Sequence, residues 1–225
     1  MAGAFPFRAV IFDMDGVIVD TEAFYWRELR AFSDALGLGI TDEELDRQVG
    51  QSHQAFQRSL VAWLARGGRE GLSPAAAEAV FEDWSRGYPC DYAELLNPGV
   101  HETIGSLRDL GVRVALASSS PLASIERVLG ECGLSDAFEI IVSGEQFHES
   151  KPDPEIYLHT LDLLGLPAGS CCCVEDSVPG ITAGKRAGLT VIAKREERFG
   201  FSQDAADAIV DGVRDVLDIG RLLAR

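Results

Sequence analysis

Two aspartates with a spacing suited to metal and phosphate chemistry follow the first apolar run of the chain. The run is Ala-Val-Ile-Phe (9–12), and Asp13 and Asp15 come directly after it. If the strand continues to Asp15, both carboxylates face one side, where a divalent cation would relieve their repulsion. Gly16 then permits a turn. Short acidic pairs also occur in helix caps and solvated turns, so this pattern alone leaves a structural interpretation open.

A second acidic pair, Glu175 and Asp176, follows another apolar run, Cys-Cys-Val (172–174). A helix opens at Ser177, and two acids there would also complement the positive end of its dipole. An apolar strand that delivers two carboxylates to the same edge as Asp13 favours a metal site instead. We expect Asp176 to be a direct ligand, and Glu175 to be a ligand or the hydrogen-bond partner of one.

Three consecutive hydroxyl side chains, Ser118, Ser119 and Ser120, stand between an apolar run and a helix. Pro121 suits the first turn of that helix, whose free N–H groups form an anion site. We expect Ser120 to cap the helix, and Ser118, with Ser119 beside it, to bind a phosphate. A purely capping role for this serine run is the alternative.

Lys151 precedes Pro152-Asp153-Pro154. The prolines stiffen the backbone, and Asp153 is suited to cap a helix that starts at Pro154. A lysine on such a loop is a well-placed point charge for a phosphate, although most lysines are only solvated surface residues.

Apolar periodicity predicts the elements that position these loops. We expect helices at 21–37, 41–64 and 74–86, with Thr41 and Ser73 as caps. From residue 97 on, helices and strands alternate. The strands expected are 8–12, 112–117, 140–143, 171–174, 190–193 and 209–210, and the later helices are 100–110, 122–132, 155–164, 180–187 and 213–223.

This pattern predicts an α/β fold, a doubly wound, Rossmann-like parallel sheet with an inserted all-helical cap domain. Residues 1–19 and 96–225 would form the core, and residues 20–95 the cap. Ligands of such sheets bind at the carboxyl ends of the strands, where all four polar clusters lie.

Composition limits the partners. The chain has 36 Asp and Glu against 20 Lys and Arg, a net charge of −16, which disfavours nucleic acid and anionic membranes. Five cysteines, three of them consecutive, indicate a buried strand in a reducing compartment. The N-terminal run is interrupted by Arg8 and is too short for a signal peptide or a membrane span. We expect a cytoplasmic protein, a monomer or weak homodimer that acts on a small phosphorylated molecule.

The chain resembles the haloacid dehalogenase superfamily of phosphohydrolases, in the branch of β-phosphoglucomutase and small sugar-phosphate phosphatases. The resemblance covers nearly the whole chain. It rests on FDMDGVIVDTE (12–22), NPGV (97–100), ALASSS (115–120), KPDPEIY (151–157) and VEDSVPGI (174–181), in the family order.

The resemblance implies a role for each motif. Asp13 would be the nucleophile that forms an aspartyl-phosphate, and Asp15 the general acid and then the base. Mg²⁺ would bind Asp13, the backbone carbonyl of Asp15, and Asp176, with Glu175 close by. Ser118, Ser119 and Lys151 would hold the phosphoryl group. The local cations would also offset the negative charge of the chain.

Two departures bear on the activity. Tyr25 stands where phosphomutase members of the branch carry a histidine, and His53 where they carry an arginine that grips a second phosphate. Both favour a Mg²⁺-dependent phosphatase of a sugar phosphate over a β-phosphoglucomutase-like phosphomutase. A dehalogenase is disfavoured because those enzymes lack the second aspartate, and a non-enzymatic binding module because the four motifs are intact.

Overall fold

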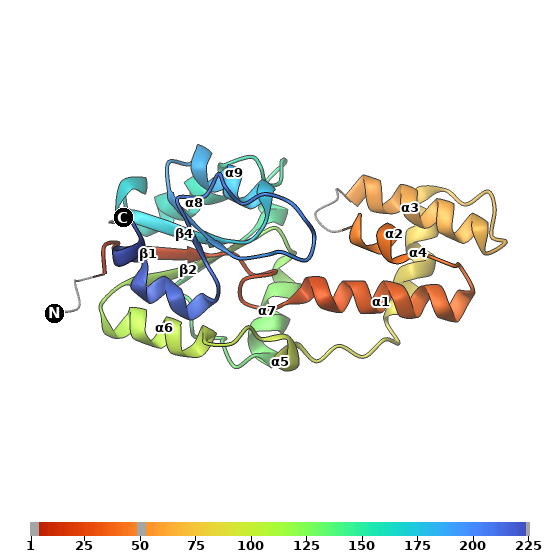
Figure 1. Cartoon of the computed structure of the whole chain (residues 1–225), viewed down its shortest axis with the longest axis horizontal. Coiled ribbons are helices and arrows are strands. Elements are labelled where there is room, and N and C mark those ends of the chain that lie inside the picture. The colour runs from red at the N-terminus through yellow and green to blue at the C-terminus, as the bar shows by residue number, and fades with distance from the viewer. Residues whose placement is uncertain (1–4, 49–52, 224–225) are drawn as a thin grey trace. The chain divides into compact units, whose positions relative to one another are not determined.

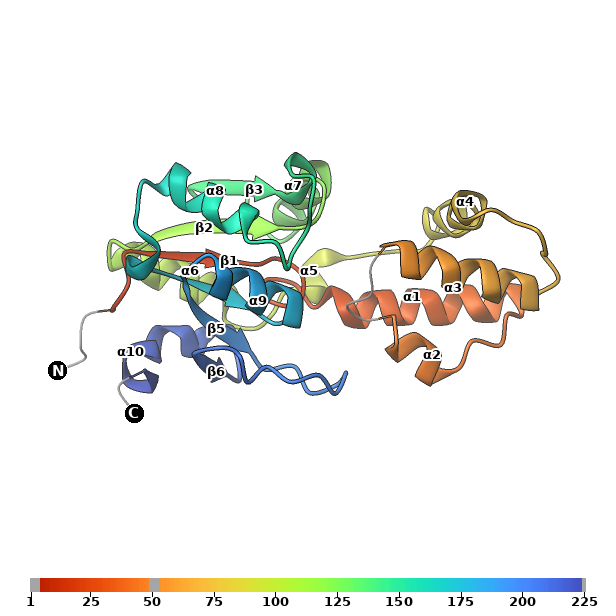
Figure 2. The same cartoon turned by 90° about the horizontal axis from the view of Figure 1, so that it is seen from above.

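The computed structural model describes residues 5–48 and 53–223. It contains one six-stranded sheet in which every neighbouring pair is parallel, in the order β3-β2-β1-β4-β5-β6. The strands are β1 (Ala9–Phe12), β2 (Arg113–Ser118), β3 (Ile140–Ser143), β4 (Cys171–Glu175), β5 (Thr190–Lys194) and β6 (Ala208–Val210). Figure 2 shows them side by side, from β3 at the top to β6 at the bottom.

Helices cover both faces of this sheet, which confirms the doubly wound α/β fold. Figure 1 shows α8 and α9 on one face and α6 on the other, with the C-terminal segment beside α6. Because both faces are covered, the central strands β1 and β4 are fully buried, and they are apolar except for Glu175 at the end of β4. The helices are α6 (Val100–Asp109), α7 (Leu122–Glu131), α8 (Glu155–Leu164) and α9 (Val178–Arg186).

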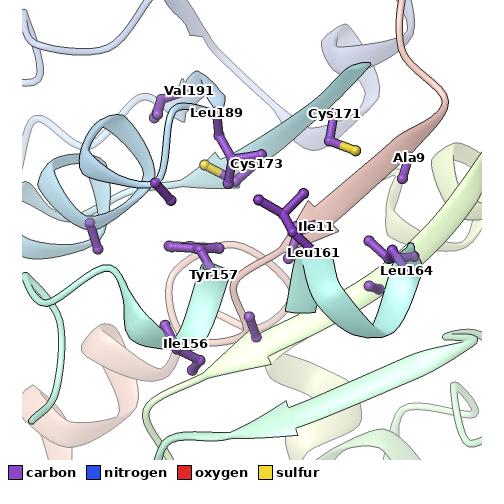
Figure 3. Packing of buried hydrophobic residues seen from close by; sticks show 14 of the residues in the cluster. Ala9, Ile11, Ile156, Tyr157, Leu161, Leu164, Cys171, Cys173, Leu189 and Val191 are labelled. Carbon is purple, nitrogen blue, oxygen red and sulfur yellow. The ribbon is translucent and has the colours of Figure 1, made fainter. Parts of the chain in front are cut away.

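The core beneath α8 and α9 is built from alternate residues of the strands. Figure 3 shows Ile11 and Cys173 pointing to this face, toward Tyr157 and Leu161 of α8. The three consecutive cysteines lie within β4 and are fully buried, as expected of a buried strand.

Residues Thr21–Asp91 form a second compact unit, inserted after the first strand, whereas Met1–Asp20 and Tyr92–Arg225 form the unit with the sheet. Its helices are α1 (Thr21–Leu36), α2 (Asp42–Asp46), α3 (His53–Arg66) and α4 (Pro74–Ser85); the short α5 (Tyr92–Leu95) follows it. Aromatic and aliphatic side chains such as Phe32 and Trp63 form its own core. The caps Thr41 and Ser73 are confirmed, since each hydroxyl accepts a backbone N–H.

Most expected boundaries lie within two residues of those in the structure, and three expectations differ by more. The helix expected at 41–64 is two helices, because α2 ends at Asp46 and α3 begins at His53. The helix expected at 213–223 is a 3₁₀ segment, η3 (Val213–Asp218), followed by α10 (Ile219–Leu222). β1 ends at Phe12, so the strand does not continue to Asp15. In the described residues no helix is long and apolar enough to cross a bilayer.

Candidate active site

The register of the sheet brings the residue after β1 between the ends of β2 and β4. Asp13 follows β1 directly, and its N–H donates to the Val174 carbonyl at 3.0 Å. The positions next to it in register are Ala117 in β2 and Glu175 in β4. This is the point where the strand order reverses, the usual place for a ligand in a doubly wound sheet.

Lys151 joins these three strand ends. Its Nζ donates to Asp13 Oδ1 at 2.6 Å, to Glu175 Oε1 at 2.7 Å and to the Ala117 carbonyl at 3.1 Å. The lysine side chain is only 7% exposed. Since Nζ has three hydrogens, these contacts match its full donor capacity. Lys151 is therefore held at a single position beside Asp13.

The loop that carries Lys151 leads into α8. The Lys151–Pro152 peptide bond is cis. Asp153 accepts the N–H of Glu155 at 2.9 Å, so its carboxylate serves the first turn of α8 as expected.

Glu175 has a partner that sequence reasoning missed, the phenol of Tyr157. The Tyr157 hydroxyl donates to Glu175 Oε1, and Lys151 Nζ lies 5.1 Å from the centre of the Tyr157 ring. The signal was present in the sequence, because Tyr157 lies six residues after Lys151 on the apolar face of α8. On the other side of Glu175 a Cβ at Gly180 would fall 1.9 Å from Oε2, so only glycine fits there.

Asp176 is fixed by two contacts from outside its own strand. The Gln203 side chain donates to the Asp176 carbonyl at 2.5 Å and to the Lys194 carbonyl at 2.8 Å. Gly16 lies against the Asp176 carboxylate, since a Cβ there would come within 1.8 Å of Oδ2. Gly16 also has a φ of +76°, so this turn requires glycine on both counts.

Burial and charge oppose each other in this cluster. Burial, together with the neighbouring carboxylates of Glu175 and Asp15, raises the pKa of Asp13 to about 8 against the attraction of Lys151. Burial alone would lower the pKa of Lys151, but Asp13 and Glu175 hold it above its usual range. Lys151 is therefore firmly charged, whereas Asp13 takes up a proton readily.

The same carboxylates fit a hard divalent cation. Asp13, Glu175 and Asp176 are all buried, and each offers an oxygen within 4.8 Å of the others. When all three are ionised, the single ammonium of Lys151 leaves an excess of negative charge, which a cation would balance. Carboxylate oxygens are the donors that Mg²⁺ prefers.

The loop after β1 carries the second aspartate of the motif. Asp15 Oδ2 accepts a hydrogen bond from Ser120 Oγ at 3.0 Å. Asn97 secures the loop from the other side, because its amide donates to the carbonyls of Gly16 and Val17 at 3.0 and 2.8 Å. In the sequence, Asn97 was only the first residue of the NPGV motif (97–100), and no contact was expected of its side chain; its buried amide beside the turn was missed.

The serine run differs in part from expectation. Ser118 is buried at the end of β2, and its hydroxyl accepts the Ser120 N–H at 3.1 Å; Ser119 is exposed. Ser120 does not cap α7, so that prediction is wrong. The carboxylate of Glu145 accepts the Leu122 N–H at the start of α7 instead, at 3.1 Å.

Of Tyr25 and His53, the two positions expected to depart from the phosphomutase pattern, the structure describes the side chain of one. Tyr25 lies on α1 and is 45% exposed. The side chain of His53 lies outside the described residues.

Known proteins are similar to this chain in sequence. The model of the haloacid dehalogenase-like hydrolase family matches residues 7–188. Hexitol phosphatase B of Escherichia coli is 34% identical over 199 residues, 85% of this chain and 87% of its own length. A phosphorylated carbohydrates phosphatase of Thermotoga maritima is 33% identical over 185 residues, 81% of this chain and 82% of its own.

Solved structures are similar to this chain in fold. The crystal structure of a putative β-phosphoglucomutase from Thermotoga maritima superposes with a TM-score of 0.77 at 28% identity, covering 95% of this chain and 98% of that one. The family match spans both acidic motifs, the serine run and Lys151. The chain therefore belongs to the haloacid dehalogenase-like hydrolases.

Proposed function

We propose that the protein is a Mg²⁺-dependent phosphatase that hydrolyses a sugar phosphate through an aspartyl-phosphate on Asp13. The observation that carries the proposal is the 2.6 Å contact between Asp13 Oδ1 and Lys151 Nζ, within the buried group that includes Glu175 and Asp176. This contact supports a site in which a nucleophile, a fixed positive charge and a set of metal donors lie together. The names of the two phosphatase relatives support the substrate class.

The proposal assigns these tasks to the residues of the site. A carboxylate oxygen of Asp13 forms a bond to phosphorus while the ester P–O bond breaks, and Asp15 gives its proton to the leaving oxygen. Asp15 then takes a proton from water, whose oxygen attacks phosphorus and releases Asp13 and inorganic phosphate. Lys151 offsets charge on the phosphoryl oxygens, and Ser118 and Ser119 donate hydrogen bonds to them.

Asp13, Asp176 and the backbone carbonyl of Asp15 would hold Mg²⁺, with Glu175 as a ligand or as the partner of one. The cation would supply charge neutralisation for the phosphoryl oxygens. Residues 20–95 would act as the cap domain that selects the substrate. The exposed Tyr25 at a position of histidine in phosphomutases favours hydrolysis over transfer within a bisphosphate.

The test is release of p-nitrophenol from p-nitrophenyl phosphate with Mg²⁺ and with EDTA. We expect metal-dependent release that falls at least ~10⁴-fold in Asp13→Asn, because the nucleophile is lost. Asp162→Asn, an exposed aspartate of α8, is the matched control and should keep wild-type activity. Equal activity of Asp13→Asn and the control would reject the mechanism.

A phosphomutase would give a different pattern. The putative β-phosphoglucomutase among the similar structures makes β-glucose 1-phosphate the second substrate to test. Conversion to glucose 6-phosphate that requires a sugar bisphosphate, with little phosphate released, would replace the phosphatase assignment by the phosphomutase one.

A further inference from the structure

The Ser120 hydroxyl points to an active-site carboxylate rather than to its own helix. Ser120 Oγ donates to Asp15 Oδ2 at 3.0 Å, although Ser120 and Asp15 are 105 residues apart. A serine just before a helix ordinarily accepts an N–H of the first turn. Here Glu145 has taken over that task through the Leu122 N–H. The hydroxyl of Ser120 is thereby released for Asp15.

The backbone of Ser120 is fixed from both sides. Its N–H donates to Ser118 Oγ at 3.1 Å, and its carbonyl accepts the Ser143 hydroxyl at 2.8 Å. The backbone of the neighbouring Ser119 packs closely on Gly144. A Cβ added to Gly144 would lie only 2.8 Å from the Cα of Ser119. Ser120 therefore presents its hydroxyl from a rigid frame made by the ends of β2 and β3.

A general acid must carry its proton on the oxygen that meets the leaving group. A carboxyl group has two oxygens and can rotate, so an unrestrained Asp15 would spend time in unproductive arrangements. A donor on Oδ2 limits this rotation. It also favours Oδ1 as the oxygen that bears the proton, because Oδ2 already accepts a hydrogen.

We propose that Ser120 is a positioning residue that orients Asp15 for proton transfer to the leaving group. The inference rests on the proposed function, in which Asp15 is the general acid. Ser120 thus differs from Ser118 and Ser119, which are proposed to contact the phosphoryl group. Loss of the Ser120 hydroxyl should slow proton transfer, and so lower the rate of hydrolysis most for esters of basic alcohols.

The experiment compares kcat/KM for phenyl phosphate and p-nitrophenyl phosphate with Mg²⁺. The two esters are similar in shape, but phenol is the more basic leaving group and depends more on an acid. In Ser120→Ala we expect about a tenfold loss with phenyl phosphate, the upper end of the effect of one neutral hydrogen bond, and about a twofold loss with p-nitrophenyl phosphate. Ser120→Thr keeps the hydroxyl and should restore the wild-type ratio.

Two further variants separate the possible failures. Ser124→Ala, an exposed serine in the first turn of α7, should leave both values unchanged. Asp15→Asn should show the same preference for the better leaving group in a stronger form. Suppose that Asp15→Asn shows this preference, but Ser120→Ala lowers kcat/KM equally for both esters or for neither. The role of Ser120 is then rejected, whereas the assignment of Asp15 as the general acid is kept. If Asp15→Asn does not show it, the acid assignment fails, and the inference with it.

Discussion

The sheet unit contains a buried ion pair, whereas the ion pairs described in the helical unit lie at its surface. In the sheet unit Lys151 and Glu175 are almost fully buried and touch each other at 2.7 Å. In the helical unit the recorded ion pairs, such as Arg30 with Asp42 and Arg66 with Glu44, lie at the surface. Its buried Glu28 accepts a hydrogen bond from Ser85 instead, and burial raises the pKa of that carboxyl.

This difference indicates that apolar packing stabilises the helical unit, whereas the buried charges of the sheet unit have a role other than stability. The helical unit is held by apolar packing, in which the Phe32 ring lies edge-on to Phe81 and Trp84 at 5.2 and 5.4 Å. A buried ion pair contributes little net stability, because desolvation offsets the attraction. The charged cluster of the sheet unit is therefore better explained by the reaction than by the fold.

Replacing Lys151 would show this most strongly. Lys151→Met should lower Mg²⁺-dependent hydrolysis by about 10³-fold and destabilise the protein by about 3–5 kcal/mol, because Asp13 and Glu175 lose their counter-charge. Lys185→Met is the control. Its ammonium also contacts a carboxylate at 2.6 Å, that of Asp207, but the pair is partly exposed and should contribute less than ~1 kcal/mol.

Denaturant unfolding and p-nitrophenyl phosphate turnover measure the two effects separately. Similar small losses in both variants would mean that the buried cluster behaves like an ordinary surface pair, and the contrast between the units would disappear.

Much of this contrast could be predicted from the sequence. The strands follow from apolar runs such as 9–12 and 171–174, and their parallel pairing follows from the alternation with helices. The common edge of a parallel sheet then brings Asp13, Lys151 and Glu175 together without any knowledge of register.

The sequence could not show contacts that depend on side-chain direction. Tyr157 looked like one more apolar-face residue of a helix, yet its hydroxyl reaches Glu175. Ser120 looked like a cap, and only the position of Glu145, 23 residues beyond Leu122, shows why it is not. Such contacts are tertiary, so local propensity carries no signal for them.

The raised pKa of Asp13 gives a weaker, pH-dependent test. The folded carboxyl keeps its proton up to about pH 8, whereas the unfolded one loses it near 3.8. The folded state thus binds more protons across this window, and the contribution of Asp13 to the stability of the metal-free protein falls as the pH rises through it.

Mg²⁺ would bind the ionised form of Asp13. The rise in Tm caused by Mg²⁺ should therefore be larger near pH 8.5 than near pH 6, and the pH dependence should be reduced in Asp13→Asn but kept in Asp162→Asn. Thermal melts with Mg²⁺ or EDTA at both pH values measure this rise in Tm. The same Mg²⁺ increment at both would contradict a cation site that includes Asp13.

The smallest effect is expected for Tyr25 of the helical unit, which can be compared with the buried Phe32. Phe32 is fully buried, whereas Tyr25 is 45% exposed. Phe32→Ala should destabilise the protein by about 3–5 kcal/mol, because it leaves a cavity. Tyr25→Ala should change stability by about 1 kcal/mol or less, since the side chain is half exposed and loses an edge-on contact with Phe24.

If the helical unit selects the substrate, Tyr25→Ala should nevertheless change KM for the preferred sugar phosphate by about three- to tenfold, the effect of a few contacts. Its kcat should stay near the wild-type value, because the reacting groups lie in the other unit. A panel of hexose, pentose and hexitol phosphates measures the ranking in both proteins. An unchanged ranking and KM would remove Tyr25 from substrate selection and leave it a surface residue of α1.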